Sequence, residues 1–222
     1  MKIATTTGTF ARFNFEYAIE DVSILLKTHD AETKRAAGRP SRSLEVFKRT
    51  GVILAVTAWE AYIEDTLTQQ FQERLQKAVA PDAIKSTFNS VSQAWLSSAP
   101  KPPDLAKWAG DGWKNVILEK FQHDISALNT PNSENVKSLF ERYFNLDITK
   151  YWKWQKISSN TACQKLDALI KLRGELVHKG KEIFESKAKV RRSNLVEAQS
   201  LVQRLVECTD LALNIAPVEK EI

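Results

Sequence analysis

The sequence predicts an all-α fold, an up-and-down bundle of helices that forms a single domain over residues 1–222. Only 7 residues are Gly and 7 are Pro, too few for the many turns of an all-β protein. Apolar residues recur every three to four positions along several long segments, which is the spacing of an amphipathic helix. With 43% hydrophobic residues, the chain can bury a sizeable core without disulfides or a structural metal.

Two helices are predicted in the first third of the chain. The first covers about 10–28, and its buried stripe consists of Phe15, Ile19, Val22 and Leu26, widened by Tyr17, Ala18 and Leu25. A polar connector follows over 28–43. Its basic residues suit a polyanion, although a solvated loop is the more common role of such a segment. The second helix, about 44–79, is apolar nearly all round in its first half, which predicts a central position, and it ends before Pro81.

The middle of the chain has a different pattern. Residues 80–157 contain short helical segments separated by proline-rich and glycine-rich turns at 100–104 and 110–112. We interpret them as a helical insertion between core helices that cover about 10–79 and 158–216. Several N-cap candidates begin the third core helix, namely Ser158, Ser159, Asn160 and Thr161.

The run from Tyr151 to Lys156 interleaves aromatic residues with lysines. Such a run can stack nucleobases and neutralise phosphates. Tryptophans in a helical protein are more often wedges between helices, with neighbouring lysines extending into solvent. Both interpretations remain open from the sequence.

Charge, cysteines and motifs narrow the class of function. The net charge of +5 and the pI near 9.1 favour an anionic partner such as nucleic acid, although a mixed solvated surface explains the same numbers. Cys163 and Cys208 are far apart and have no companion histidines, so we expect neither a disulfide nor a zinc site.

No long apolar run or signal segment is present, which predicts a cytoplasmic protein with no membrane contact. Nucleotide-binding, zinc-protease and hydrolase motifs are missing from the sequence, and no cofactor or metal is expected.

The segment 165–180 contains a charge in an unusual place. On a helix, Leu166, Leu169, Ile170, Leu172, Leu176 and Val177 form one apolar sector, and Arg173 falls near its middle. A guanidinium there cannot lose its charge, so it needs a carboxylate, a cleft or an anionic ligand. His178 follows five residues later.

The stretch 172–180 (LRGELVHKG) resembles the R-x4-6-H motif of HEPN domains, and 52–65 (VILAVTAWEAYIED) is similar to the matching helix of the RiboL-PSP-HEPN branch. The resemblance implies a HEPN-like bundle and a metal-independent endoribonuclease. Such enzymes are commonly toxins or phage-defence effectors that act as homodimers, and an antitoxin or defence-system protein is a possible partner. Arg173 and His178 would be the catalytic residues. The position after the motif arginine is usually polar and here is Gly174, so Glu175, with Lys179, is expected to support the site.

The chemistry of these residue types agrees with the resemblance. Cleavage of RNA by its own 2′-hydroxyl needs a proton-transfer group, which histidine supplies, and cationic stabilisation of the phosphate, which arginine supplies. The basic residues expected to contact RNA are Lys171, Lys181, Arg191 and Arg192. On a straight helix Arg173 and His178 lie about 140° apart with about 7.5 Å of rise. A helix end at His178, or a second subunit, is therefore needed to bring both to one phosphate.

Other interpretations of the same residues do not require catalysis. Arg173 could pair with Glu60 or Glu64, and His178 could be a helix-terminal residue favoured by the dipole. Glu175 is spaced to pair with Lys171 and Lys179. The alternative function is therefore a non-catalytic HEPN-type subunit that binds nucleic acid or regulates, or a purely structural helical protein.

Overall fold

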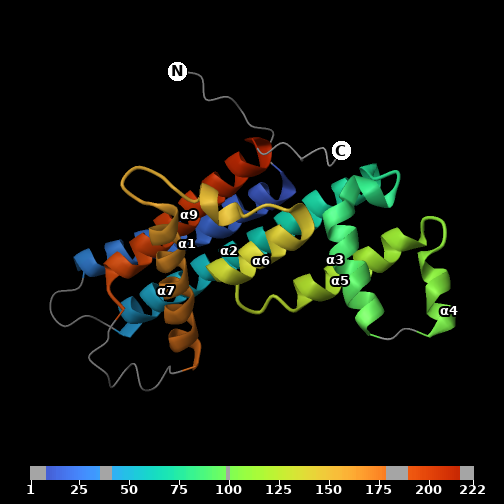
Figure 1. Ribbon diagram of the computed structural model, residues 1–222. Coiled ribbons are helices and arrows are strands. Elements are labelled where there is room, and N and C mark those ends of the chain that lie inside the picture. The colour runs from blue at the N-terminus through green and yellow to red at the C-terminus, as the bar shows by residue number, and fades with distance from the viewer. Residues whose placement is uncertain (1–8, 36–41, 99–100, 179–189, 216–222) are drawn as a thin grey trace.

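The computed structural model describes residues 9–35, 42–98, 101–178 and 190–215, which form an all-α bundle (Figure 1). Three long helices lie side by side: α1 (Phe10–Arg35), α2 (Arg42–Lys77) and α9 (Arg192–Ile215). Near one end of the bundle α7 (Ser159–His178) crosses them, while α6 (Ser133–Phe144) lies along α2 (Figure 1). The predicted all-α bundle is confirmed.

Shorter helices form an arm at the other end of α2 (Figure 1). They are η1 (Pro81–Ile84), α3 (Lys85–Ser97), α4 (Pro102–Leu105), η2 (Ala106–Trp108) and α5 (Gly112–Ser126), and η3 (Ile148–Tyr151) later leads from α6 to α7. Phe71 of α2 stacks on Phe121 of α5 with ring centroids 4.4 Å apart. The buried residues of arm and bundle belong to one hydrophobic cluster, so the segment that we interpret as an insertion shares its packing with the core helices.

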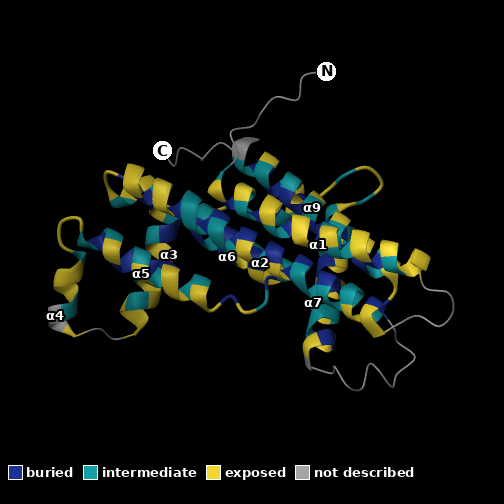
Figure 2. Cartoon of the chain, turned by 180° about the vertical axis from the view of Figure 1, so that it is seen from behind, coloured by how far each residue is buried: buried dark blue, intermediate teal, exposed yellow. Residues whose placement is uncertain are grey.

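The helix α2 runs through the centre of this cluster. Its predicted stripe is fully buried and consists of Val52, Val56, Trp59, Ile63 and Leu67. Figure 2 shows buried residues on the inward faces of the long helices and many exposed ones on the arm. A Cβ at Gly51 would lie 2.6 Å from a methyl of Leu195, so the glycine allows α2 and α9 to approach closely. No helix within the described ranges is long and apolar enough to cross a membrane.

Two expectations about α1 are wrong. The helix continues to Arg35 instead of ending near residue 28, because no proline or glycine interrupts the sequence before Gly38 and because His29 is buried. Tyr17 does not widen the buried stripe and is 76% exposed. Tyr17 lies two residues, or about 200°, from the fully buried Phe15 and therefore points away from the core.

Candidate functional site

The motif helix α7 begins and ends close to where the sequence predicts. The Ser158 hydroxyl accepts a hydrogen bond from the Thr161 backbone N–H at 3.2 Å, so this N-cap prediction is confirmed. Leu166, Leu169 and Leu176 are buried as expected. Val177 is 48% exposed, because the predicted apolar sector is wider than the face that α7 packs against its neighbours.

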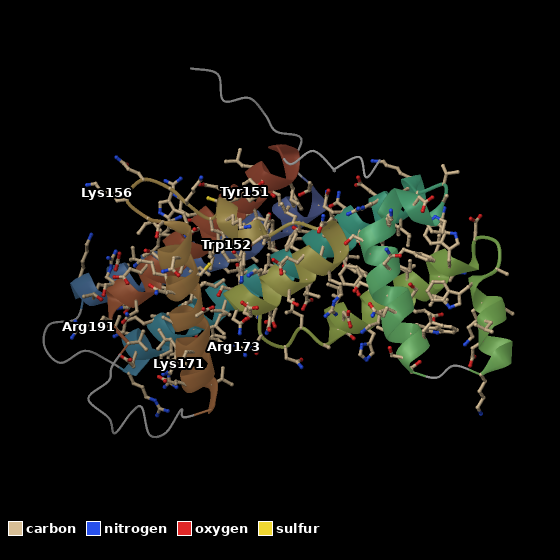
Figure 3. The ribbon with its side chains drawn as sticks, in the orientation of Figure 1. Tyr151, Trp152, Lys156, Lys171, Arg173 and Arg191 are labelled. Atoms are coloured by element: carbon tan, nitrogen blue, oxygen red, sulfur yellow. The ribbon has the colours of Figure 1, made fainter. Side chains whose placement is uncertain are left out.

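Arg173 is half-buried on the lower half of α7 in the view of Figure 3. Its Nε atom is buried and has no hydrogen-bond partner among the described residues. Within those residues no carboxylate lies within 4.0 Å of the guanidinium. Arg173 as a whole is only half-buried, and its guanidinium forms no hydrogen bond with a described residue, so its N–H donors remain available to an anion.

The carboxylate of Glu60 on α2 interacts electrostatically with Arg173. Desolvation raises the pKa of the Glu60 carboxyl above its ordinary value, and the positive charge of Arg173 acts in the opposite direction. One helical turn further along α2, desolvation and the charges of Glu60 and Asp65 raise the pKa of Glu64. Arg173 therefore sits in the field of Glu60 without a direct ion pair, and the suggested structural pairing is present only as a longer-range attraction.

His178 is the last residue of α7, and its side chain lies outside the described part of the chain. Both motif positions are therefore on one continuous helix. Five residues of α-helix place them about 140° apart around the axis, with about 7.5 Å of rise. The helix path in a single chain does not by itself bring the two positions to one side.

Arg49 is a residue of this region that our sequence analysis missed. From α2, its guanidinium donates to the backbone carbonyl of Leu176 at 3.2 Å. This carbonyl lies in the last turn of α7, where intrahelical donors are missing and the helix dipole is negative. A second arginine is thus fixed at the end of α7 that carries His178. The available signal was the adjacent pair Lys48 and Arg49 just before the apolar-rich run 52–59 of the same helix.

The predicted supporting residues do not form a closed network. Glu175 and Lys171 are exposed, and the expected i,i+4 ion pair between them is not formed within 4.0 Å. That detail of the prediction is wrong, because exposed side chains gain little from such a pair. Lys179 and Lys181 lie outside the described residues. A Cβ at Gly174 would meet nothing within 4 Å, so packing does not require glycine after Arg173.

Arg191 and Arg192, both expected to contact RNA, differ in whether the guanidinium is already paired within the chain. Arg192 holds Asp30 of α1 through two hydrogen bonds of 2.6 Å, and this lowers the pKa of the Asp30 carboxyl to about 2. Arg191 is exposed, and its backbone N–H donates to the Asn194 side chain at 2.8 Å. Only Arg191 presents an uncommitted guanidinium among these two.

The two tryptophans of the aromatic and basic run 151–156 differ in burial. Trp152 is fully buried, packs edge-on against Trp59 at 5.6 Å and donates from Nε1 to Thr209 at 2.9 Å. For Trp152 the wedge interpretation is confirmed. Trp154 is only half-buried, so one part of the run still faces outward.

Comparison with known proteins adds one finding. A family model described as RiboL-PSP-HEPN matches residues 14–214, a range that includes α2, α7 and the segment 80–157. Comparisons with curated proteins and with solved structures gave no significant match. Within the described residues, no three His, Cys, Asp or Glu side chains converge as a metal site.

Proposed function

Because the chain belongs to the RiboL-PSP-HEPN family, we propose that it is a metal-independent endoribonuclease whose catalytic residues are Arg173 and His178. The observation that carries the proposal is the setting of Arg173. Its guanidinium is half-buried, its Nε has no described partner, and no described carboxylate saturates it. An arginine that served only the fold would be expected to have a close partner.

In the proposed reaction the 2′-hydroxyl of one nucleotide attacks the adjacent phosphorus. The His178 imidazole accepts the hydroxyl proton or returns a proton to the departing 5′-oxygen. The Arg173 fork donates hydrogen bonds to the non-bridging oxygens of the pentavalent phosphate, where negative charge develops. The products are a 2′,3′-cyclic phosphate and a 5′-hydroxyl. The negative charge of Glu60 attracts the arginine without forming a direct ion pair with it.

The 140° separation of the two motif positions leads us to propose that the active form is a homodimer. One copy would supply Arg173 and its partner would supply His178 at each phosphate. In this role the protein would act as a toxin or phage-defence effector, with an antitoxin or defence-system protein as a further partner. Arg49, at the His178 end of α7, is a candidate for a second phosphate contact.

A cleavage assay in EDTA tests the catalytic assignment. Wild-type protein, Arg173→Ala and His178→Ala are incubated with a mixed RNA substrate, and the cleaved ends are identified by enzymatic labelling. Loss of EDTA-resistant cleavage in both variants supports the assignment. Cleavage that is unchanged in either variant contradicts it.

Mixing the two inactive variants tests the composite site. If each site takes Arg173 from one copy and His178 from the other, every mixed dimer contains one intact site. Statistical mixing then restores about one quarter of the wild-type sites. No recovery after verified subunit exchange means that both residues act within one chain.

The alternative candidate is a HEPN-type subunit that binds nucleic acid without cleaving it. Gly174 favours this alternative, because the resemblance places a polar side chain after the motif arginine. RNA binding by wild-type protein together with no EDTA-resistant cleavage would establish it.

A further inference from the structure

A groove with a cavity of about 500 Å³ lies between α7 and α9. From α7 the lining residues follow the spacing i, i+3, i+4 and i+7 and are Lys165, Ala168, Leu169 and Leu172. From α9 the same spacing gives Asn194, Glu197, Ala198 and Leu201, and Val196 and Ser200 widen this side of the groove. Trp154 and Ile157 contribute to the lining from the turn that precedes α7. A volume of this size is typical of a site for one small ligand group.

Small residues in the sequence leave the space that forms this groove. Ala168 and Ala198 occupy the middle positions of the two faces, beside the core residues Leu169 and Leu201. A single methyl group at each middle position leaves space that a larger aliphatic side chain would fill. Ala168 is exposed, so its small size is not imposed by packing within the chain.

A tight turn holds Trp154 at the groove. Trp154 and Ile157 exchange two backbone hydrogen bonds, of 3.1 and 2.9 Å, and Lys156 between them has a left-handed φ of 66°. The turn places the half-buried Trp154 at the cavity, with Lys156 two residues after it in sequence. A partly exposed indole is a suitable platform for stacking a nucleobase.

The charged groups around the groove suit an anion. Lys165 lines the groove, Lys156 belongs to the adjoining turn, and Arg191 lies three residues before Asn194, the first lining residue of α9. Figure 3 shows Lys156 and Arg191 at the same end of the molecule as α7. None of the three forms an ion pair within 4.0 Å with a described residue. Glu197 is the one carboxylate in the lining. Within the lining Lys165 and Glu197 balance, and Lys156 and Arg191, which lie beside the lining in sequence, add positive charge that complements a phosphate backbone.

The polar lining groups suit the edge of a base. The Asn194 side-chain oxygen accepts the Arg191 N–H at 2.8 Å, which leaves its amide N–H groups as donors. The Glu197 carboxylate can accept from an exocyclic amino group. A protein helix could satisfy the cationic rim, but a flat indole together with an amide and a carboxylate around one small cavity matches a single unpaired base better.

We propose that the α7–α9 groove binds an unpaired nucleobase of single-stranded RNA, stacked on Trp154, and that Lys156, Lys165 and Arg191 contact the flanking phosphates. The inference rests on the proposed function, since it assigns a binding site for the substrate of the same enzyme. Arg173 directly follows the lining residue Leu172 and lies about 12 Å along α7 from Lys165. A short run of nucleotides therefore connects the bound base with the phosphate at Arg173.

Binding of a fluorescent 2′-O-methyl RNA oligonucleotide, measured by anisotropy, tests the proposal without cleavage, because this RNA lacks the attacking hydroxyl. Ala168→Leu fills the groove from an exposed position and should raise the Kd roughly tenfold, the effect of losing one stacked base. The matched control is Ala94→Leu, the same substitution at an exposed position of α3, which should leave the Kd unchanged. Wild-type affinity in Ala168→Leu, with its fold verified by circular dichroism, overturns the proposal.

Sedimentation of the same variants distinguishes a protein interface from an RNA site. A dimer that dissociates in Ala168→Leu while the Kd for RNA stays at the wild-type value assigns the groove to a second copy and overturns the proposal. Glu197→Gln adds a test of base contact. Wild-type protein should bind oligo(C) more tightly than oligo(U), because only cytosine has an amino group for the carboxylate, and the variant should lose this preference. Equal binding of both oligonucleotides by wild-type protein contradicts the assigned base contact.

The groove and the active site can fail independently. Weaker RNA binding in Ala168→Leu with no EDTA-resistant cleavage by wild-type protein would leave the groove assignment standing and remove the enzyme. Cleavage that depends on Arg173, together with an RNA Kd that Ala168→Leu leaves unchanged, would support the enzyme and remove the groove assignment.

Discussion

Two arginines face carboxylates across contacts between helices, and their settings differ. Arg192 of α9 holds Asp30 of α1 through two hydrogen bonds of 2.6 Å, and the pKa of Asp30 falls to about 2. Arg173 of α7 faces Glu60 of α2 without an ion pair to any described residue, and desolvation raises the pKa of Glu60. We call these two contacts the Arg192 junction (α9 with α1) and the Arg173 junction (α7 with α2). At the Arg192 junction the guanidinium and the carboxylate bind each other, whereas at the Arg173 junction N–H donors of the guanidinium remain available. The difference separates an arginine that joins helices from one that is suited to an external phosphate.

The largest expected difference between the two junctions is in catalysis. Arg173→Ala should lower EDTA-resistant RNA cleavage by roughly 10²- to 10³-fold, the usual cost of removing a donor to a developing charge. Arg192→Ala should cleave RNA as the wild type does and should melt at a lower temperature. Cleavage rates and thermal melts of both variants check the contrast. Equal loss of cleavage in the two variants would remove the distinction between the junctions.

A smaller effect is expected next to Arg173. Gly174→Asn supplies the polar side chain that the family resemblance places after the motif arginine, and no described atom blocks a Cβ there. We expect a severalfold higher cleavage rate. Gly174→Ala is the control, because replacing glycine within a helix by alanine stabilises by up to about 1 kcal/mol and adds no polar group. If Gly174→Ala raises cleavage as much as Gly174→Asn, the gain comes from helix stability and not from the side chain.

The helices of the bundle could be predicted because apolar spacing alone defines them. The stripe of α2, the N-cap at Ser158 and the helix end before Pro81 each depend on a few neighbouring residues. The sequence also identified Arg173 as misplaced. It named Glu60 as one of two candidate partners of Arg173, but it could not choose between them or find the contact of Arg49, because both depend on how α7 crosses α2, which no local pattern encodes.

The errors have a related cause. Tyr17 is apolar enough to count toward a stripe, yet it lies on the solvent-facing side of α1. The groove beside α7 also escaped sequence analysis, because Ala168 and Ala198 leave space only once the two helices are packed together. Single-helix patterns predict which residues are apolar, but the arrangement of helices decides which apolar residues are covered.

Two carboxylate-to-amide substitutions should change stability in opposite directions at pH 7. In Glu60→Gln the charge that desolvation disfavours is removed, so we expect a gain of about 0.5 kcal/mol at most, since the group is partly exposed. In Asp30→Asn the stabilising pair with Arg192 is weakened, so the melting temperature should fall. Thermal melts at pH 7 measure both. A lower melting temperature for Glu60→Gln would mean that Glu60 and Arg173 form a structural pair after all.

The smallest effect is in the acid dependence of stability, which also differs in sign between the junctions. The pKa of Asp30 is lowered from 3.8 to about 2 by Arg192. Its contribution is therefore complete above about pH 4 and is lost as the pH falls toward 2. The raised pKa of Glu60 acts in the opposite sense, because the penalty of its ionised form is relieved as the pH falls through its folded value.

The difference in melting temperature between wild type and Asp30→Asn should accordingly shrink from pH 4 to pH 2. The gain in Glu60→Gln should already disappear at a higher pH, near the ordinary pKa of a glutamate. Difference curves between each variant and the wild type cancel the titration of all other carboxylates. Glu32→Gln is measured alongside as a carboxylate-to-amide substitution on the same helix, where Glu32 forms an exposed ion pair with Arg35 at 3.2 Å. A constant difference for Asp30→Asn between pH 4 and pH 2 would mean that the Arg192 junction is held by packing and not by its charge.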